Sequence, residues 1–174
     1  EKDLDGVVIC GNFVAEEMKK IVACVRKLPM VFLGQTNFCP GETDWVTYEV
    51  EDAVTMAMDC LRNTGHRRIL YLGRLDIEGT PERNSKLFCF HEYLRRHPEM
   101  ELAGVVEGEH GVTNGRAMME QWLAGNSILP DALFVTNDPI AIGALQVLQE
   151  RHIEVPSQIS VVSINGDCTA SAVS

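Results

Sequence analysis

Residues 131–165 have the sequence DALFVTNDPIAIGALQVLQERHIEVPSQISVVSIN. It predicts one strand–helix–strand unit. Residues 132–135 and 159–164 are short apolar runs, which are typical of strands buried on both faces of a parallel sheet. Between them Asp138 is expected to cap a helix, and Pro139 suits the first turn because its missing N–H has no partner there. The stretch therefore predicts two parallel strands joined by a right-handed crossover.

An asparagine follows each of these two strands. Asn137 and Asn165 come just after the apolar runs, and so lie at the carboxyl edge of the sheet, where open α/β folds bind ligands. A carboxamide both donates and accepts hydrogen bonds, which suits sugar hydroxyls and other small polar ligands. Asparagine also begins turns and caps helices, and the spacing alone leaves that structural interpretation open.

The rest of the chain repeats the same alternation of strand and helix. Further strands are predicted at residues 7–10, 30–34, 69–73 and 102–107, and further helices at 14–27, 51–63, 84–96 and 113–124. Thr113 is expected to cap the last of these helices. Residues 45–48 alternate only weakly. They could form a short extended piece, and they are expected to be the crossover between two lobes. The pattern predicts an α/β fold of mostly parallel sheets with helices on both faces.

Composition narrows the class of protein. The 174 residues carry a formal net charge of −10, so this chain alone is not expected to bind DNA strongly. No apolar run is long enough for a membrane helix, and residues 1–5 do not look like a signal peptide. No Cys and His spacing suggests a metal site. We expect reduced thiols, most of them on apolar faces, in a cytoplasmic protein, at Cys10, Cys24, Cys39, Cys60, Cys89 and Cys168.

The opening stretch also resembles a known family. The sequence VTNDPIAIGAL followed by VPSQISVVSIN is similar to the effector-binding core of the LacI/GalR family of bacterial transcription regulators. Glu51-Asp52 at a helix start and TGHRRI at residues 64–69 match further signatures of that family. The resemblance covers nearly the whole chain. The loop after Gly73 and the ending Ser163-Ile164-Asn165 are similar to the galactose-repressor and evolved-β-galactosidase-repressor branch.

The resemblance implies a periplasmic-binding-protein-like (type I) fold with two lobes, of which the first is incomplete. A partial first lobe is expected over residues 1–44, and the second lobe over 45–165. Residues 166–174 would be a truncated crossover tail. The helix-turn-helix headpiece and the C-terminal end of the family are absent from this chain.

Matched by order along the chain, the resemblance implies five effector contacts. Asp52 stands at the family's acidic position in the first helix of the second lobe, and Lys86 where an arginine usually grips sugar hydroxyls. His110 stands where some members place an aromatic ring that stacks on the sugar. Asn137 and Asn165 match the Asn-Asp motif and the position after the last strand. A lysine ammonium is a point charge, whereas an arginine guanidinium can form two parallel hydrogen bonds. The sugar contacts that the family makes through arginine are therefore not expected in the same form at Lys86.

Three of these residues also have a structural interpretation that the sequence leaves open. Asp52 could only help to cap its helix. Lys86 could be exposed to solvent on a helix face, as most lysines are. His110 could be a loop residue without a ligand.

The resemblance implies that this chain is the sugar-sensing core of a repressor and that its effector is galactoside-like. The repressor would act as a homodimer. DNA would be bound only through the absent headpiece, and no cofactor or membrane partner is implied. An alternative is a sugar-binding protein of a transport system, which shares the fold and the cleft. An enzyme is not expected, because the GxGxxG, GxxxxGK[ST], HExxH and GxSxG motifs are absent.

Overall fold

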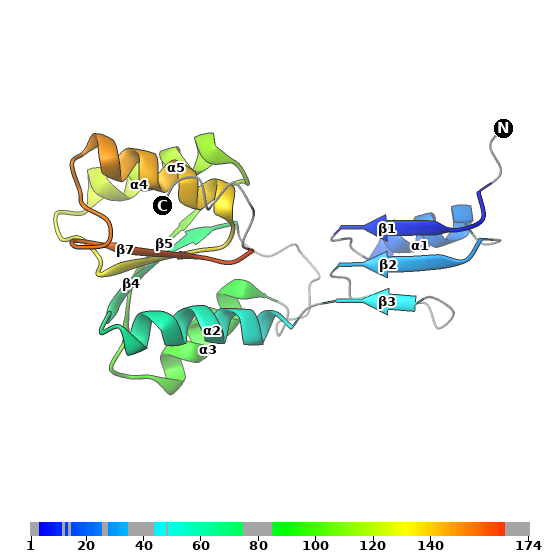
Figure 1. The fold of residues 1–174 in the computed structure, drawn as a ribbon, viewed down its shortest axis with the longest axis horizontal. Coiled ribbons are helices and arrows are strands. Elements are labelled where there is room, and N and C mark those ends of the chain that lie inside the picture. Colours follow the sequence, from blue (N-terminus) through cyan, green and yellow to red (C-terminus); the bar gives the residue numbers. More distant parts are fainter. Residues whose placement is uncertain are drawn as a thin grey trace.

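The structure is a computed structural model that describes residues 4–11, 13, 15–25, 28–34, 44–47, 49–74 and 85–165. Within these residues the strands form two separate parallel sheets, one of three strands and one of four (Figure 1). None of the described helices is both long enough and apolar enough to span a bilayer.

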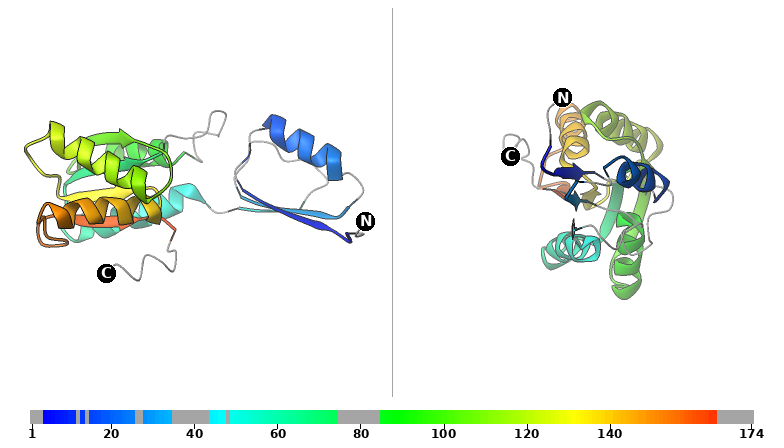
Figure 2. Two further views of the ribbon diagram at one scale, coloured as in Figure 1. Left: turned by 90° about the horizontal axis from the view of Figure 1, so that it is seen from above. Right: turned by 90° about the vertical axis from the view of Figure 1, so that its right-hand side faces the viewer.

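The first sheet is built from three short parallel strands in the order β1-β2-β3. They are β1 (Val7–Cys10), β2 (Met30–Leu33) and β3 (Asp44–Val46). Helix α1 (Ala15–Val25) connects the first two and lies across one face of the sheet (Figure 2). This parallel β–α–β unit is the arrangement that the sequence predicts for residues 7–34.

Residues 45 and 46 belong to β3, so the short extended piece that the sequence suggested is present there. The crossover between lobes that was expected over residues 45–48 stays a prediction. Trp45 pairs with Phe32 and Val46 with Leu33 in a parallel ladder. The Trp45 indole N–H also donates to the carbonyl oxygen of Gly34 at 3.1 Å. The expected boundary between residues 44 and 45 therefore falls inside a strand of the first sheet. The division into two lobes otherwise stays a prediction, and the expected tail over 166–174 lies outside the described residues.

The second sheet contains four parallel strands in the order β5-β4-β6-β7. The strands are β4 (Arg68–Gly73), β5 (Glu101–Glu107), β6 (Ala132–Val135) and β7 (Ser160–Ser163). The helices are α2 (Val50–Asn63), α3 (Lys86–Arg96), α4 (Val112–Gly125) and α5 (Asp138–Glu150). Figure 1 shows α2 and α3 on one face of the sheet and α4 and α5 on the other. The predicted α/β fold with helices on both faces is confirmed.

Both faces of the second sheet are apolar because its central strands are buried on both sides. Successive side chains of a strand point to opposite faces, so each central strand supplies both cores. One core contains Leu70, Leu72, Leu133 and Val135 with residues of α4 and α5. The other contains Ile69, Tyr71, Ala132 and Phe134 with residues of α2 and α3. This double burial explains why β4 and β6 appear in the sequence as continuous apolar runs rather than alternating ones.

Two glycines let α4 and α5 pack with their backbones in close approach. A Cβ on Gly143 would lie 2.1 Å from the carbonyl oxygen of Val112, and a Cβ on Gly115 would lie 2.2 Å from that of Ile140. Any side chain at either position would force the helices apart. The first turns of the two helices are therefore held against each other.

Two smaller expectations were wrong. Helix α4 begins at Val112 after Gly111, whose φ of 122° favours glycine, so Thr113 lies inside the first turn instead of capping it. The cysteines do not mostly lie on buried apolar faces, because Cys10, Cys24 and Cys60 are exposed and only Cys89 is buried among those described. All four are free thiols, and Cys39 and Cys168 lie outside the described residues.

Candidate functional site

The strand order reverses next to β4, and this reversal locates the candidate site. From β4 the chain moves outward to β5, then crosses back over β4 to form β6 and β7. The helices that follow β4 and β6, α3 and α5, therefore lie on opposite faces of the sheet. In open α/β sheets, ligands bind outside the carboxyl ends of the strands at such a reversal.

Asn137 lies at this edge and has two functions in the structure. Its Oδ1 accepts a hydrogen bond from the backbone N–H of Ile140 at 3.1 Å, so Asn137 is the N-cap of α5. Its Nδ2 lies 2.7 Å from Nδ1 of His110 and 3.4 Å from Oγ1 of Thr136. The expectation that Asp138 caps this helix was wrong: Asp138 is the first helical residue. The structural interpretation of Asn137 as a helix cap is therefore correct for its amide oxygen, whereas its amide nitrogen faces His110.

His110 comes to Asn137 from a different strand. It lies in the loop after β5, and its backbone carbonyl accepts a hydrogen bond from Nδ2 of Asn114 at 3.0 Å. Because β4 separates β5 from β6 in the sheet, the His110–Asn137 contact spans the carboxyl end of β4. The ring itself is exposed.

Lys86 is the third predicted residue in this group. It is the first residue of α3, it is half-buried, and its Nζ donates to the carbonyl oxygen of Thr136 at 2.7 Å. The structural interpretation of Lys86 as a solvent-exposed residue is therefore wrong. Thr136 packs where β4 ends in a glycine, and a Cβ on Gly73 would lie 2.2 Å from Oγ1 of Thr136. Lys86, His110 and Asn137 thus meet around one short segment after β6.

The structure does not bring Asp52 and Asn165 into this group. Asp52 is exposed in the first turn of α2, and its side chain makes no hydrogen bond or ion pair within the described residues. Asn165 is exposed after β7, and its φ of 149° lies in a region that favours glycine. Their part in any ligand contact stays a prediction.

Sequence reasoning missed two further features of this edge. Arg74 directly follows β4, and its Nε lies 3.7 Å from a carboxylate oxygen of Glu109. Ser163 donates its hydroxyl to the carboxylate of Asp138, which is only 1% exposed. Arg74 could have been found, because the rule that selected Asn137, a polar residue after a strand, applies to it as well.

Comparison with known proteins identifies the family. The sequence profile described as a periplasmic binding protein-like domain matches residues 58–174. The chain belongs to the periplasmic binding protein-like domain family. This match includes all four strands of the second sheet and four of the five predicted effector contacts, Lys86, His110, Asn137 and Asn165.

Relatives of this periplasmic binding protein-like domain are transcription regulators. It is 30% identical to the HTH-type transcriptional repressor MelR of Bacillus subtilis (strain 168), over 95% of this chain and 48% of the repressor. It is 27% identical to the HTH-type transcriptional regulator GalR of Streptococcus thermophilus, over 99% of this chain and 52% of that protein. The chain spans about half the length of the curated relatives it matches. The resemblance to the LacI/GalR family is confirmed.

Solved structures support the fold of the domain. A dimeric Lac repressor matches with a TM-score of 0.79 at 23% identity, over 98% of this chain and 60% of that one. A LacI transcriptional regulator from Rhodococcus species matches with a TM-score of 0.77 at 25% identity, over 93% and 58%. These likenesses confirm the periplasmic-binding-protein-like architecture.

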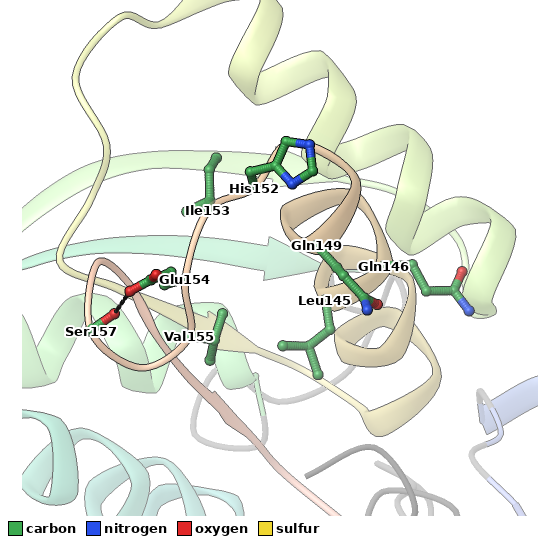
Figure 3. A pocket seen from close by; sticks show the side chains of 8 residues that line it. All are labelled: Leu145, Gln146, Gln149, His152, Ile153, Glu154, Val155 and Ser157. Atoms are coloured by element: carbon green, nitrogen blue, oxygen red, sulfur yellow. Dashed lines mark hydrogen bonds between the residues drawn. The ribbon is translucent and has the colours of Figure 1, made fainter.

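The periplasmic binding protein-like domain also has a hollow far from the candidate site. It has a volume of about 580 Å³ and is formed by the end of α5 and the loop that leads to β7 (Figure 3). Its lining consists of Leu145, Gln146, Gln149, His152, Ile153, Glu154, Val155 and Ser157. The end of α5 lies at the amino edge of the sheet, so strand topology and polar contacts, rather than the size of a hollow, select the carboxyl edge as the site. Among the described residues, no group of three or more His, Cys, Asp or Glu side chains could hold a metal ion.

Proposed function

We propose that this domain is the effector-sensing part of a bacterial transcriptional regulator and binds a small, galactoside-like sugar between two lobes. The observation that carries the proposal is the meeting of Lys86, His110 and Asn137 at the carboxyl edge of the second sheet. The whole protein would act in the cytoplasm as a homodimer and would bind DNA through a headpiece outside this chain. Asp52 and Asn165 would join the contacts when a sugar is bound.

The chemistry of this group suits a polyhydroxyl ligand. An ammonium group, a carboxamide and an imidazole offer directional donors and acceptors, which sugar hydroxyls can complement. Arg74 is paired with Glu109, and Asp138 contributes a carboxylate to the same edge. The edge therefore holds charges of both signs, which favours a neutral polar ligand over a strongly anionic one.

The proposed mechanism is a change in the relative orientation of the lobes. An effector that makes better contacts in one arrangement increases the population of that arrangement. Because two headpieces of a dimer must match two half-sites on the operator, the arrangement of the lobes would control DNA binding. The two relatives described above are named as transcriptional regulators, which favours this function over a sugar-binding protein of a transport system.

Calorimetry tests the proposal. The chain is titrated with galactose, lactose, glucose and a sugar phosphate, and then Lys86→Met and Asn137→Ser are compared with the wild type. Serine is chosen because it can still cap α5, whereas alanine would also destabilise the helix. Lys20→Met, on the exposed side of α1, is the control for loss of a positive charge.

Binding of one sugar that both site variants weaken at least tenfold, with Lys20→Met unchanged, supports the proposal. Binding that survives both site variants would show that the sugar does not use this edge. No binding of any sugar by a chain with a cooperative unfolding transition would argue against a sugar effector for this domain.

A further inference from the structure

The amide of Asn137 has only one possible orientation. The backbone N–H of Ile140 lies 3.1 Å from one end of it, and an N–H can pair only with the oxygen end. The NH₂ end must therefore face His110, whose Nδ1 lies 2.7 Å away. Helix capping thus decides an assignment that is ordinarily ambiguous for asparagine side chains.

The orientation of this amide determines where the proton of His110 resides. The Nδ2 group carries only donors, so Nδ1 of His110 must accept and cannot carry a proton. The neutral imidazole then has its proton on Nε2. Within the described part of the chain, Nε2 has no hydrogen-bond partner, and the ring is exposed at the carboxyl edge.

We infer that Asn137 is a positioning residue that fixes His110 in the Nε2–H tautomer, so that His110 offers the effector a hydrogen-bond donor rather than an aromatic face. The complementary ligand group is an acceptor oxygen, such as a ring, hydroxyl or carbonyl oxygen. The part that concerns the effector rests on the proposed function. The tautomer itself is a property of the free protein and does not depend on it.

The backbone around His110 supports this function. The Asn114 side chain holds the His110 carbonyl at 3.0 Å, and Asn114 belongs to the first turn of α4. That turn packs closely against the first turn of α5 through Gly115 and Gly143. The ring and its partner therefore project from two helix starts that are fixed relative to each other, which allows a single hydrogen bond to set the orientation of the ring.

Nuclear magnetic resonance of the ¹⁵N-labelled, ligand-free chain is the direct test. Spectra are recorded at about pH 8.5, well above the ordinary histidine pKa of about 6.5, so that the rings are neutral. The chain has five histidines, and His110→Gln identifies the resonances of His110. We expect the Nε2–H tautomer and a scalar coupling between Asn137 Nδ2 and His110 Nδ1 across the N–H···N bond. A folded wild-type chain with the Nδ1–H tautomer, or without this coupling, would overturn the inference.

Asn137→Asp provides a matched reversal. Aspartate can still cap α5 through one oxygen, and its second oxygen replaces the donor with an acceptor. His110 must then carry a proton on Nδ1, so we expect its tautomer to change from Nε2–H to Nδ1–H. An Nε2–H ring in the folded variant would mean that residue 137 does not control His110.

A binding measurement tests the function of the donor, with galactose as the probe. His110→Phe keeps an aromatic face and removes the donor, whereas His110→Gln keeps an N–H donor and removes the ring. We expect His110→Phe to weaken binding about tenfold and His110→Gln to weaken it less. The opposite order would show that the ring stacks on the sugar, and would overturn the donor function. If the wild-type chain binds no sugar, the proposed function fails, while the scalar coupling still decides whether Asn137 positions His110.

Discussion

The hydroxyl of Ser163 donates a hydrogen bond to the carboxylate of Asp138 and so ties the end of β7 to the first turn of α5. The carboxylate is almost completely buried at the N-terminus of a helix, where the helix dipole favours a negative charge. Asp138 is therefore a structural residue of the carboxyl edge, and it fixes the helix that Asn137 caps.

Ser163→Ala should lower the free energy of unfolding by about 1.5–3 kcal/mol, because it removes a hydrogen bond to a buried charged group. Urea denaturation followed by circular dichroism measures the change. Ser160→Ala, at the other end of β7, is the control and should change stability by less than about 0.5 kcal/mol. Equal losses in the two variants would mean that the bond to Asp138 contributes nothing specific.

Gly143→Ala should destabilise the chain by about 1–3 kcal/mol or more, because its Cβ would collide with the backbone of α4, 2.1 Å from the Val112 oxygen. Gly125→Ala is the matched control, since a Cβ at Gly125 would meet nothing within 4 Å. Thermal unfolding of both variants measures the contrast. A Gly143→Ala variant as stable as the control would show that the two helices can separate without cost.

Asp131→Asn should lower the free energy of unfolding at neutral pH but not in acid. Burial raises the pKa of Asp131, but the backbone N–H groups of Arg68 and Arg67, at 2.8 and 2.9 Å, help to lower it more, so that it lies below its ordinary value. A carboxyl group whose pKa is lower in the folded state stabilises the fold at pH values above its unfolded pKa of about 3.9. This stabilisation is lost as the pH falls through the folded pKa.

The measurement for Asp131 is urea denaturation from about pH 7 down to about pH 3. The wild type should be more stable than Asp131→Asn at the upper end, and the difference should shrink below about pH 4. Asp5→Asn, an exposed aspartate with no hydrogen bond or ion pair inside the described ranges, should follow the wild type throughout. A difference for Asp131→Asn that is independent of pH would exclude its carboxylate charge as the cause.

Tyr93→Phe tests a second contact, a partly buried one between α3 and α2. The Tyr93 hydroxyl donates to a carboxylate oxygen of Asp59 at 2.5 Å, and burial together with that carboxylate raises the pKa of Tyr93. We expect a loss of about 1–3 kcal/mol below about pH 10, where an unfolded tyrosine is still protonated. Because a raised folded pKa gives stability that is lost as the pH rises through it, the difference should shrink in stronger alkali. A constant difference would contradict the assignment.

The order of elements could be predicted because its causes are local. β4 and β6 are short apolar runs, and α2 and α5 have apolar residues at helical spacing, so both classes are visible in the sequence. For β3 the sequence suggested only a short extended piece at residues 45–48 and not a strand of the first sheet. The three residues of β3 are exposed, and only their pairing with β2 makes them a strand. Pairing is a long-range property that composition does not reveal.

The candidate site was predictable only to the level of strand ends. That rule selected His110 and Asn137, and the structure places them in contact. It could not say that Asn137 rather than Asp138 caps α5, because this depends on the extended backbone of Asn137, with φ −162° and ψ 160°. Nor could it predict that Lys86 reaches the carbonyl of Thr136, since that contact joins residues 50 positions apart.

Gly73 makes the candidate site sensitive to a residue that has no side chain to offer a ligand. A Cβ there would displace Thr136. The Thr136 carbonyl oxygen, which accepts from Lys86, and the adjacent residue Asn137 would move with it. If an effector binds at this edge, as proposed, a Gly73→Ala variant should lower the affinity for it even though residue 73 offers no side-chain contact. In a survey of mutants, loss of response at position 73 would indicate displaced partners on two helices, not a missing contact to the effector.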